Sequence, residues 1–236
     1  MKPLRVSLSS ACTAARASHV WHVLRGAALG LGLLAAPLLA GGCRERAPAL
    51  MPPLFSDSFD RGELGPDWRV TAPPGVYRLV DGELVVRGAR NHPAWLTREL
   101  PRDAIIEVDV RSMSNDGDIK VEAWGDGKSF ATELEYTSSG YVFIHGGWKN
   151  RVTALCRLEE HGHDRQQRQD RPVMPGKKYH YMIARKGRSV KWFIDGELAL
   201  QLEDPAPLEG PGHAYFGFDD WETELRFDNL VIRPAG

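Results

Sequence analysis

The stretch Ala104-Ile105-Ile106-Glu107-Val108-Asp109-Val110-Arg111-Ser112 decides the fold class. Apolar side chains at positions 106, 108 and 110 alternate with charged side chains at positions 107, 109 and 111. Successive side chains of a β-strand point to opposite faces, so this period of two predicts a half-buried strand. The chain is therefore expected to contain a sheet with one apolar and one solvated face.

The same rhythm continues on both sides of this strand. Strands are expected at 76–80, 83–87, 104–112, 119–124, 141–145, 152–158, 178–185, 190–195, 197–202, 213–218 and 224–233. Asp81-Gly82 and Asp195-Gly196 separate two of the pairs, and Asp-Gly suits a tight primed hairpin turn. Many short strands without a long helix predict an all-β sandwich or barrel. The charged segment 159–175 is expected to be an irregular loop, either functional or disordered.

The N-terminal region has the composition of an export signal. Residues 1–42 contain four basic residues and no acidic one, and an uncharged apolar run covers residues 26–40. This run is too short to span a bilayer, which needs about 20 residues. Small residues at 40–42 precede Cys43. A basic lead, a short apolar core and small residues before a cleavage point predict a secretory signal.

Leu39–Cys43 resembles the bacterial lipoprotein box, in which the cysteine is acylated and becomes the first mature residue. The sequence departs from the family at Ala40, because a branched apolar residue is preferred three positions before the cysteine. Simple secretion and a buried apolar helix are the alternatives to lipidation. Arg44 follows the cysteine, and the lack of Asp there implies outer-membrane sorting in an organism with two membranes.

The predicted organisation is a signal peptide at 1–42, a lipidated cysteine and tether at 43–53, and one β-sandwich domain at 54–236. Without the signal the net charge is −5, since the signal removes four of the 30 basic and none of the 31 acidic residues. A mildly acidic chain gives no electrostatic basis for binding nucleic acid. Cys12 leaves with the signal, so Cys156 is expected to be a lone buried thiol of structural role.

Both ends of the predicted domain resemble concanavalin A-like lectin/glucanase domains, in the style of the 3-keto-disaccharide hydrolase-like domains of exported bacterial proteins. The resemblance rests on Phe55–Asp60, Leu64–Trp68 and Val80–Leu84 near the start, and on Trp192–Gly196, Pro207–Gly210 and Phe227–Leu230 near the end. It implies a jelly roll of two packed antiparallel sheets. The fold carries lectins, hydrolases, lyases and inert modules, so it does not imply one activity. Trp68 is expected in the core, and Asp228-Asn229 is expected to form a bulge or an edge position.

The resemblance to glucanases breaks down at the catalytic motif. Laminarinase-type enzymes of this fold carry Glu-x-Asp-x-Glu, whose terminal carboxylates act as nucleophile and acid/base. The similar stretch here begins with Glu107 and Asp109, but Arg111 occupies the last acidic place. Without the second carboxylate that mechanism does not transfer. A salt-bridged, solvated outer face is the expected role of these residues.

A polar and aromatic cluster follows several strand ends and suits a sugar. Flat rings can stack on the apolar face of a sugar while neighbouring polar groups bind its hydroxyls. The predicted ligand-binding residues are His145, Trp148, Asn150, Arg157, His161, His213 and Trp221. The alternative interpretation is that the tryptophans cap the sandwich and the polar groups stabilise loops.

Other chemistry is conceivable at the same positions. His161 and His163 are spaced as a His-x-His pair that could bind a metal, although no further spacing supports this. Either could instead act as a general base with a carboxylate such as Glu135 or Glu160. The acidic pair Asp219-Asp220 supplies the hard oxygen ligands that calcium prefers.

The leading hypothesis is an envelope-anchored, non-catalytic carbohydrate-binding module with no obligatory cofactor. Its expected partners are a glycan and, through Cys43, a membrane. The alternatives are a glycan-active hydrolase or lyase that uses the histidine-rich region, and a structural or protein-binding envelope domain.

Overall fold

The computed structural model describes residues 51–132 and 138–236, which form two antiparallel sheets. The first, sheet A, has eight strands in this described region. Its order is β13-β12-β11-β6-β15-β4-β3, with β1 also paired to β15. The strands are β1 (Phe55–Asp57), β3 (Tyr77–Val80), β4 (Glu83–Arg87), β6 (Ala104–Ser112), β11 (Tyr179–Lys186), β12 (Ser189–Ile194), β13 (Glu197–Glu203) and β15 (Glu224–Pro234).

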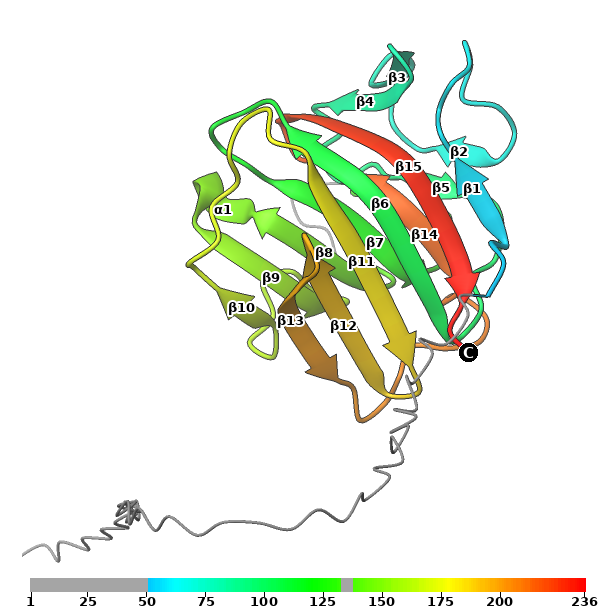
Figure 1. Ribbon diagram of the computed structural model, residues 1–236, viewed down its shortest axis with the longest axis vertical. Helices are drawn as coiled ribbons and strands as arrows, with labels where there is room; N and C mark the ends of the chain where they lie inside the picture. The colour runs from blue at the N-terminus through cyan, green and yellow to red at the C-terminus, as the bar shows by residue number, and fades with distance from the viewer. Residues whose placement is uncertain (1–50, 133–137) are drawn as a thin grey trace, which may run out of the picture. The chain divides into compact units, whose positions relative to one another are not determined.

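Sheet B has seven strands in the same described region, in the order β10-β9-β8-β7-β14-β5-β2. They are β2 (Trp68–Val70), β5 (Ala94–Leu96), β7 (Ile119–Gly125), β8 (Tyr141–Gly146), β9 (Val152–Arg157), β10 (Gln166–Arg168) and β14 (Tyr215–Asp219). Figure 1 shows sheet A in front, with sheet B behind it. The predicted two-sheet antiparallel sandwich is confirmed.

The core lies between the sheets and follows directly from the period of two. Strand β6 alternates strictly between buried and partly exposed residues. Ile106, Val108 and Val110 are at most 1% exposed and meet apolar rows from sheet B, including Phe216 and Phe218 of β14. Complete burial of one such side chain stabilises the fold by about 1.5–3 kcal/mol.

The predicted turns and the predicted bulge are also present. Asp81 and Gly82 have φ values of 54° and 77°, and Asp195 and Gly196 have values of 52° and 80°. Positive φ at both central positions is the primed hairpin geometry that matches the twist of the flanking strands. The register of β15 against β6 shifts between Asp228 and Val231, which is the expected bulge.

Four short strands and one turn were not predicted from the sequence. Strands β1, β2 and β5 have three residues each, too few to show alternation. Strand β10 corrects the expectation of an irregular segment at 159–175, because Gln166–Arg168 pairs with β9. Its residues are polar, so backbone hydrogen bonds to β9, and not apolar burial, hold this edge strand. The turn α1 (Gly147–Asn150) contains left-handed residues and follows β8.

Trp68 and Cys156 are buried, as predicted. Trp68 is 6% exposed and stacks on Phe218 at 5.2 Å between ring centroids. Cys156 is a free thiol in the described region, 0% exposed, and burial raises its pKa to about 12. A thiol that stays protonated is a poor nucleophile, so its role is structural. Within the described residues, no helix combines the length and apolar character needed to cross a membrane.

Asp57 fastens the N-terminal strand to the sandwich. Its carboxylate accepts hydrogen bonds from Trp68 Nε1 at 2.8 Å, Phe59 N at 2.9 Å and Arg61 Nη2 at 2.9 Å. Burial alone would raise the pKa of Asp57, but the bonds from Arg61, Trp68 and Phe59 outweigh it and hold the pKa below its usual value. These bonds therefore favour the ionised, folded form.

We expect Asp57→Ala to lower the free energy of unfolding by about 2 kcal/mol, because buried N–H donors lose their acceptor. Urea unfolding at pH 7 measures this. The folded pKa lies below the unfolded one, so the stability is present above about pH 4 and disappears as the pH falls through the folded pKa. The exposed neighbour Asp60 is the control, since Asp60→Ala should change stability by less than about 0.5 kcal/mol. Equal losses in both variants would contradict this assignment.

Candidate functional site

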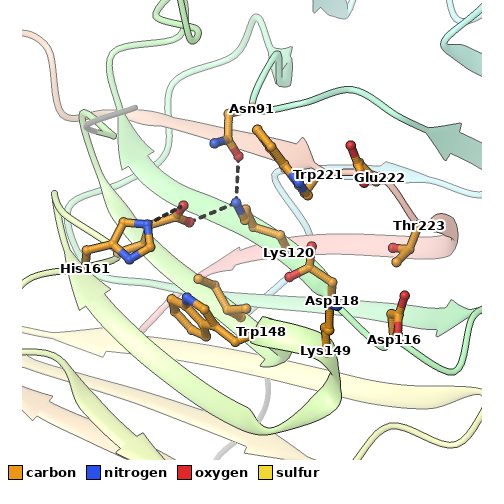
Figure 2. Close-up of a pocket in the computed structure, with 12 residues that line it drawn as sticks. Asn91, Asp116, Asp118, Lys120, Trp148, Lys149, His161, Trp221, Glu222 and Thr223 are labelled. Carbon is orange, nitrogen blue, oxygen red and sulfur yellow. Dashed lines mark hydrogen bonds and ion pairs between the residues drawn. The ribbon is translucent and has the colours of Figure 1, made fainter. Parts of the chain in front are cut away.

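A cleft of about 340 Å³ lies over the outer face of sheet B, the face turned away from sheet A. Figure 2 shows that its lining side chains come from strands and loops far apart in the sequence. The lining residues are Asn91, Asp116, Asp118, Lys120, Ile144, Trp148, Lys149, Glu160, His161, Trp221, Glu222 and Thr223. Three predicted ligand-binding residues, Trp148, His161 and Trp221, are therefore together in one cleft.

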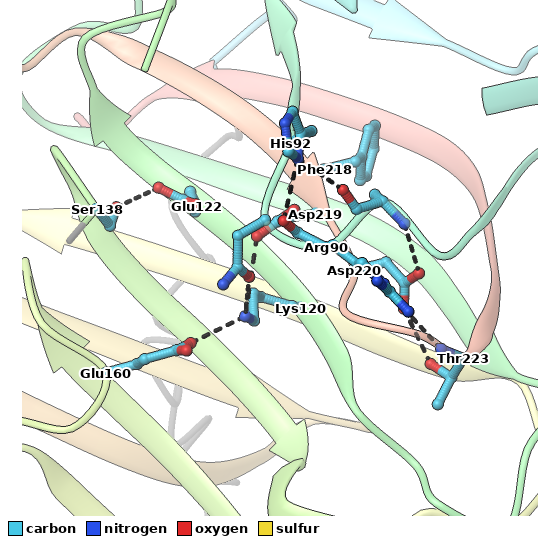
Figure 3. A network of polar contacts seen from close by, with 12 residues as sticks. Arg90, His92, Lys120, Glu122, Ser138, Glu160, Phe218, Asp219, Asp220 and Thr223 are labelled. Carbon is cyan, nitrogen blue, oxygen red and sulfur yellow. Dashed lines mark hydrogen bonds and ion pairs between the residues drawn. The ribbon is translucent and has the colours of Figure 1, made fainter. Parts of the chain in front are cut away.

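Lys120 forms the polar floor of this cleft. It lies on β7, is 3% exposed, and donates hydrogen bonds to Asn91 Oδ1 at 2.6 Å and Glu160 Oε2 at 2.9 Å. Asp219 Oδ2 lies 3.9 Å from its Nζ (Figure 3). Burial would lower the pKa of Lys120, but the carboxylates of Glu160, Asp219 and Asp118 raise it well above its usual value. Lys120 is consequently a fixed cation at neutral pH.

Asp118 adds a carboxylate beside this cation. It precedes β7, lines the cleft, and has its pKa raised by burial, against the opposing effect of Lys120. The floor of the cleft therefore presents an ammonium group and carboxylate oxygens. Such groups can bind the hydroxyls of a polar ligand.

Trp148 reaches the cleft from a left-handed turn. Trp148, Lys149 and Asn150 have φ values of 51°, 60° and 61°, a costly conformation for residues with a Cβ. The side chain of Asn150 holds the turn by donating to Val173 O at 2.7 Å and accepting from Val173 N at 2.7 Å. Asn150 does not line the cleft, so its place in the structure is that of a positioning residue for Trp148.

Trp221 reaches the cleft from the loop after β14, which Asp220 holds in place. Asp220 accepts hydrogen bonds from Gly88 N at 2.6 Å and Thr223 N at 3.1 Å, and burial raises its pKa to about 7. Asp219 is 0% exposed and lies beside the Lys120 ammonium. Asp220 thus holds the loop in place, and Asp219 provides a buried acidic group next to Lys120. No group of three or more potential metal-binding His, Cys, Asp or Glu side chains occurs within residues 51–132 and 138–236.

The two predicted histidines separate in the structure. His161 packs edge-on against Trp148, with 5.7 Å between ring centroids, and its Nε2 lies 3.7 Å from Glu160 Oε1. The Arg165 guanidinium covers the Trp148 ring at 4.7 Å. His163 is exposed and does not line the cleft. The proposed partner Glu135 lies outside the described residues, as does Cys43.

Three other predicted ligand-binding residues lie elsewhere. His145 belongs to the inward row of β8, where its Nδ1 is 2.9 Å from Tyr181 Oη and its Nε2 is 3.1 Å from Arg171 O. Arg157 Nε donates to Asp204 Oδ2 at 2.9 Å. His213 lines a separate hollow. Strand alternation explains the placing of His145, since it has the same parity as the buried Phe143 and not as Ile144, which lines the cleft.

Sequence reasoning missed Asn91, Asp118 and Lys120. The available signal was polar alternation in β7, where Lys120 and Glu122 are interleaved with Val121 and Ala123. Both polar residues are almost completely buried, and Glu122 accepts a hydrogen bond from Ser138 Oγ. From the sequence alone, a polar row on a strand indicates a solvated face. Only the structure shows that loops cover this face of sheet B and turn the polar row into the floor of a cleft.

The incomplete glucanase motif lies on the opposite side of the molecule, on the outer face of sheet A. Asp109 Oδ1 is 2.9 Å from His180 Nδ1, Arg111 forms an ion pair with Glu83, and Glu107 forms one with Arg233. These contacts match the expected salt-bridged outer face.

The comparisons with known proteins agree on the fold. No protein-family model matches the chain, and no curated protein does. A Bacillus subtilis protein of unknown function with a galectin-like fold has a TM-score of 0.59 at 14% identity, covering 79% of this chain and 97% of that one. The carbohydrate-binding module CBM66 from Bacillus subtilis has a TM-score of 0.53 at 15% identity, covering 71% of this chain and 95% of that one.

A β-glucanase from Bacillus licheniformis is similar as well, with a TM-score of 0.53 at 11% identity and coverage of 77% of this chain and 98% of that one. The chain thus has the concanavalin A-like jelly-roll fold, as the sequence resemblance implied. Since both binding modules and hydrolases have this fold, the cleft and not the fold must decide the function.

The structure predicts an unusual titration for His145. Burial lowers its pKa to about 4, because the charged imidazolium would lose hydration between the sheets. An NMR titration of the imidazole resonances should give a midpoint near pH 4. Because the unfolded pKa is about 6.5, protonation of His145 should reduce stability as the pH falls from 6.5 to 4. A midpoint near pH 6.5 in the folded protein would place this ring in solvent instead.

Proposed function

We propose that the chain is an envelope-anchored lipoprotein whose β-sandwich binds carbohydrate in the cleft over sheet B, without catalysing a reaction. The observation that carries the proposal is the meeting of Trp148, Trp221 and His161 above the Lys120 cation. Indole rings suit the apolar faces of sugars, and fixed polar groups suit their hydroxyls.

The dimensions and chemistry of the cleft support a small polar ligand. Its volume of about 340 Å³ is at the lower end of the usual range for ligand sites, about 300–1,000 Å³. The ammonium group of Lys120 and the carboxylate of Asp118 both line the cleft. A ligand with several hydroxyl groups therefore meets both a hydrogen-bond donor and an acceptor. The likeness to CBM66 adds support at the level of the fold.

The tryptophans provide the direct test. We expect Trp148→Ala and Trp221→Ala each to weaken glycan affinity by about 30-fold, equivalent to about 2 kcal/mol for an anchoring aromatic residue. Glycan-array screening of the purified protein identifies the ligand, and calorimetry measures the affinities. His180→Ala is the matched control, because His180 lies beside Asp109 on the outer face of sheet A, away from the cleft, and should leave the affinity unchanged.

The same experiment separates the alternatives. The His161–Glu160 contact of 3.7 Å favours a hydrolase or lyase as the second candidate, with His161 as general base. That candidate requires product release from the bound glycan, and its loss in His161→Ala. Glu160 is already bound to Lys120, which opposes a free catalytic role for this carboxylate. If no glycan on a broad array binds, the structural or protein-binding alternative replaces the carbohydrate proposal.

The anchor rests on the sequence pattern at Cys43 and is tested separately. Radiolabelled palmitate should enter the wild-type protein and fail to enter Cys43→Ser, because the thiol is the acylation site. Outer-membrane placement, proposed from Arg44, is checked by fractionating cells that express the wild type. Equal labelling of both proteins would exclude lipidation at this cysteine.

A further inference from the structure

A buried arginine at one end of the sandwich lacks most of its hydrogen-bond partners. Arg185 occupies the inward row of β11, after Tyr181 and Ile183, and is 0% exposed. Its Nη1 donates to Leu208 O at 2.6 Å. Its Nε and Nη2 find no hydrogen-bond acceptor among residues 51–132 and 138–236. Buried guanidinium groups are normally paired, so this arrangement requires an explanation.

The guanidinium is held rigidly in place. It packs over the Trp124 ring at 5.1 Å and near the Tyr141 ring at 5.8 Å. Contact with these rings restricts its movement, and the Leu208 carbonyl fixes one end. The two unpaired groups, Nε and Nη2, are neighbours on one side of the guanidinium. This side presents two parallel N–H donors, the arrangement that binds both oxygens of a carboxylate.

Arg185 lines a hollow of about 620 Å³ that is distinct from the cleft and shares no lining residue with it. Arg102, Lys128, His213 and Tyr215 line the same hollow. His213 Nδ1 lies 2.8 Å from Ser139 O, and Tyr215 Oη donates to Glu99 Oε1 at 3.2 Å. The Asp126 carboxylate in this hollow accepts hydrogen bonds from its own loop, including the Ser129 backbone N–H at 2.8 Å. His213, Tyr215 and Asp126 therefore have partners of their own, whereas the buried Nε and Nη2 of Arg185 remain unpaired within the described residues.

Glu209 stands in front of Arg185 without satisfying it. Its Oε2 is 4.0 Å from Arg185 Nη2, beyond hydrogen-bond distance, while it forms an ion pair with Arg102. Glu209 is half exposed, so its side chain can turn away into solvent. A ligand carboxylate that comes within hydrogen-bond distance of Arg185 could replace Glu209 between Arg102 and Arg185.

We propose that this hollow is a second ligand site, which binds a carboxylate-bearing sugar through Nε and Nη2 of Arg185, with Glu209 as a displaceable occupant. The hollow has room for a sugar ring, and Tyr215 offers a partly exposed ring at its wall. The site would bind uronic acids, whereas the cleft over sheet B would bind through its tryptophans. His213, predicted as a ligand-binding residue, would then belong to this second site.

Calorimetry with glucuronate, glucose and acetate tests the proposal on the whole protein. Glucuronate should bind more tightly than either of the others, because glucose lacks the carboxylate and acetate lacks the ring. Glu209→Gln should tighten glucuronate binding by about tenfold, since a competing negative charge is removed. Glu197→Gln is the matched control: Glu197 is also an exposed partner of an arginine, Arg171, but lies outside the hollow. The glucuronate affinity of Glu197→Gln should match that of the wild type.

Arg185→Met should abolish glucuronate binding, with circular dichroism used to check folding. Trp148→Ala should leave glucuronate binding intact, which separates this site from the proposed glycan cleft. Equal affinity for glucose or acetate would overturn the proposal, as would absence of glucuronate binding in both the wild type and Glu209→Gln. A loss of thermal stability in Glu209→Gln without any change in glucuronate affinity would instead identify Glu209 as the structural partner of Arg185.

Discussion

The structure depends on the requirement that both sheets bury one apolar row per strand. Ile106, Val108 and Val110 of β6 satisfy it in sheet A, and Phe216 and Phe218 satisfy it in sheet B. Once these rows meet, the outer face of each sheet must contact either solvent or covering loops. The outer face of sheet A meets solvent and carries ion pairs such as Arg111–Glu83. The outer face of sheet B is instead covered by loops, and the cleft lies between these loops and the sheet.

The outer face of sheet B is covered by loops and carries buried polar groups. Lys120 and Asp219 are almost completely buried there, and Trp95 fills the neighbouring surface over Gly217, where an added Cβ would lie 2.8 Å from its ring. A buried lysine is stable only with partners, and Asn91 and Glu160 supply them from two separate loops. Two further segments, the turn α1 and the loop after β14, bring Trp148 and Trp221 to the same cleft. The polar floor and the aromatic walls are thus consequences of one arrangement.

The two hollows of the sandwich differ in chemistry. The cleft over sheet B combines an ammonium group, carboxylates and two partly exposed indole rings, which suits hydroxyl-rich ligands. The hollow at the end of the sandwich has three basic and three acidic lining residues, and within it the unpaired edge of Arg185 suits a carboxylate.

The sequence by itself determined the longer strands, because period-two alternation and Asp-Gly turns are local signals that neighbouring residues set, but not the three-residue strands β1, β2, β5 and β10. It also determined the bulge at Asp228-Asn229 and the burial of Trp68. Tertiary structure decided which polar residues meet. Strand parity sends His145 into the core, loop geometry brings Trp148 to Trp221, and the covering of sheet B turns Lys120 from an apparent surface residue into the floor of a cleft. These are contacts between segments distant in sequence, and no local pattern encodes the distance between them.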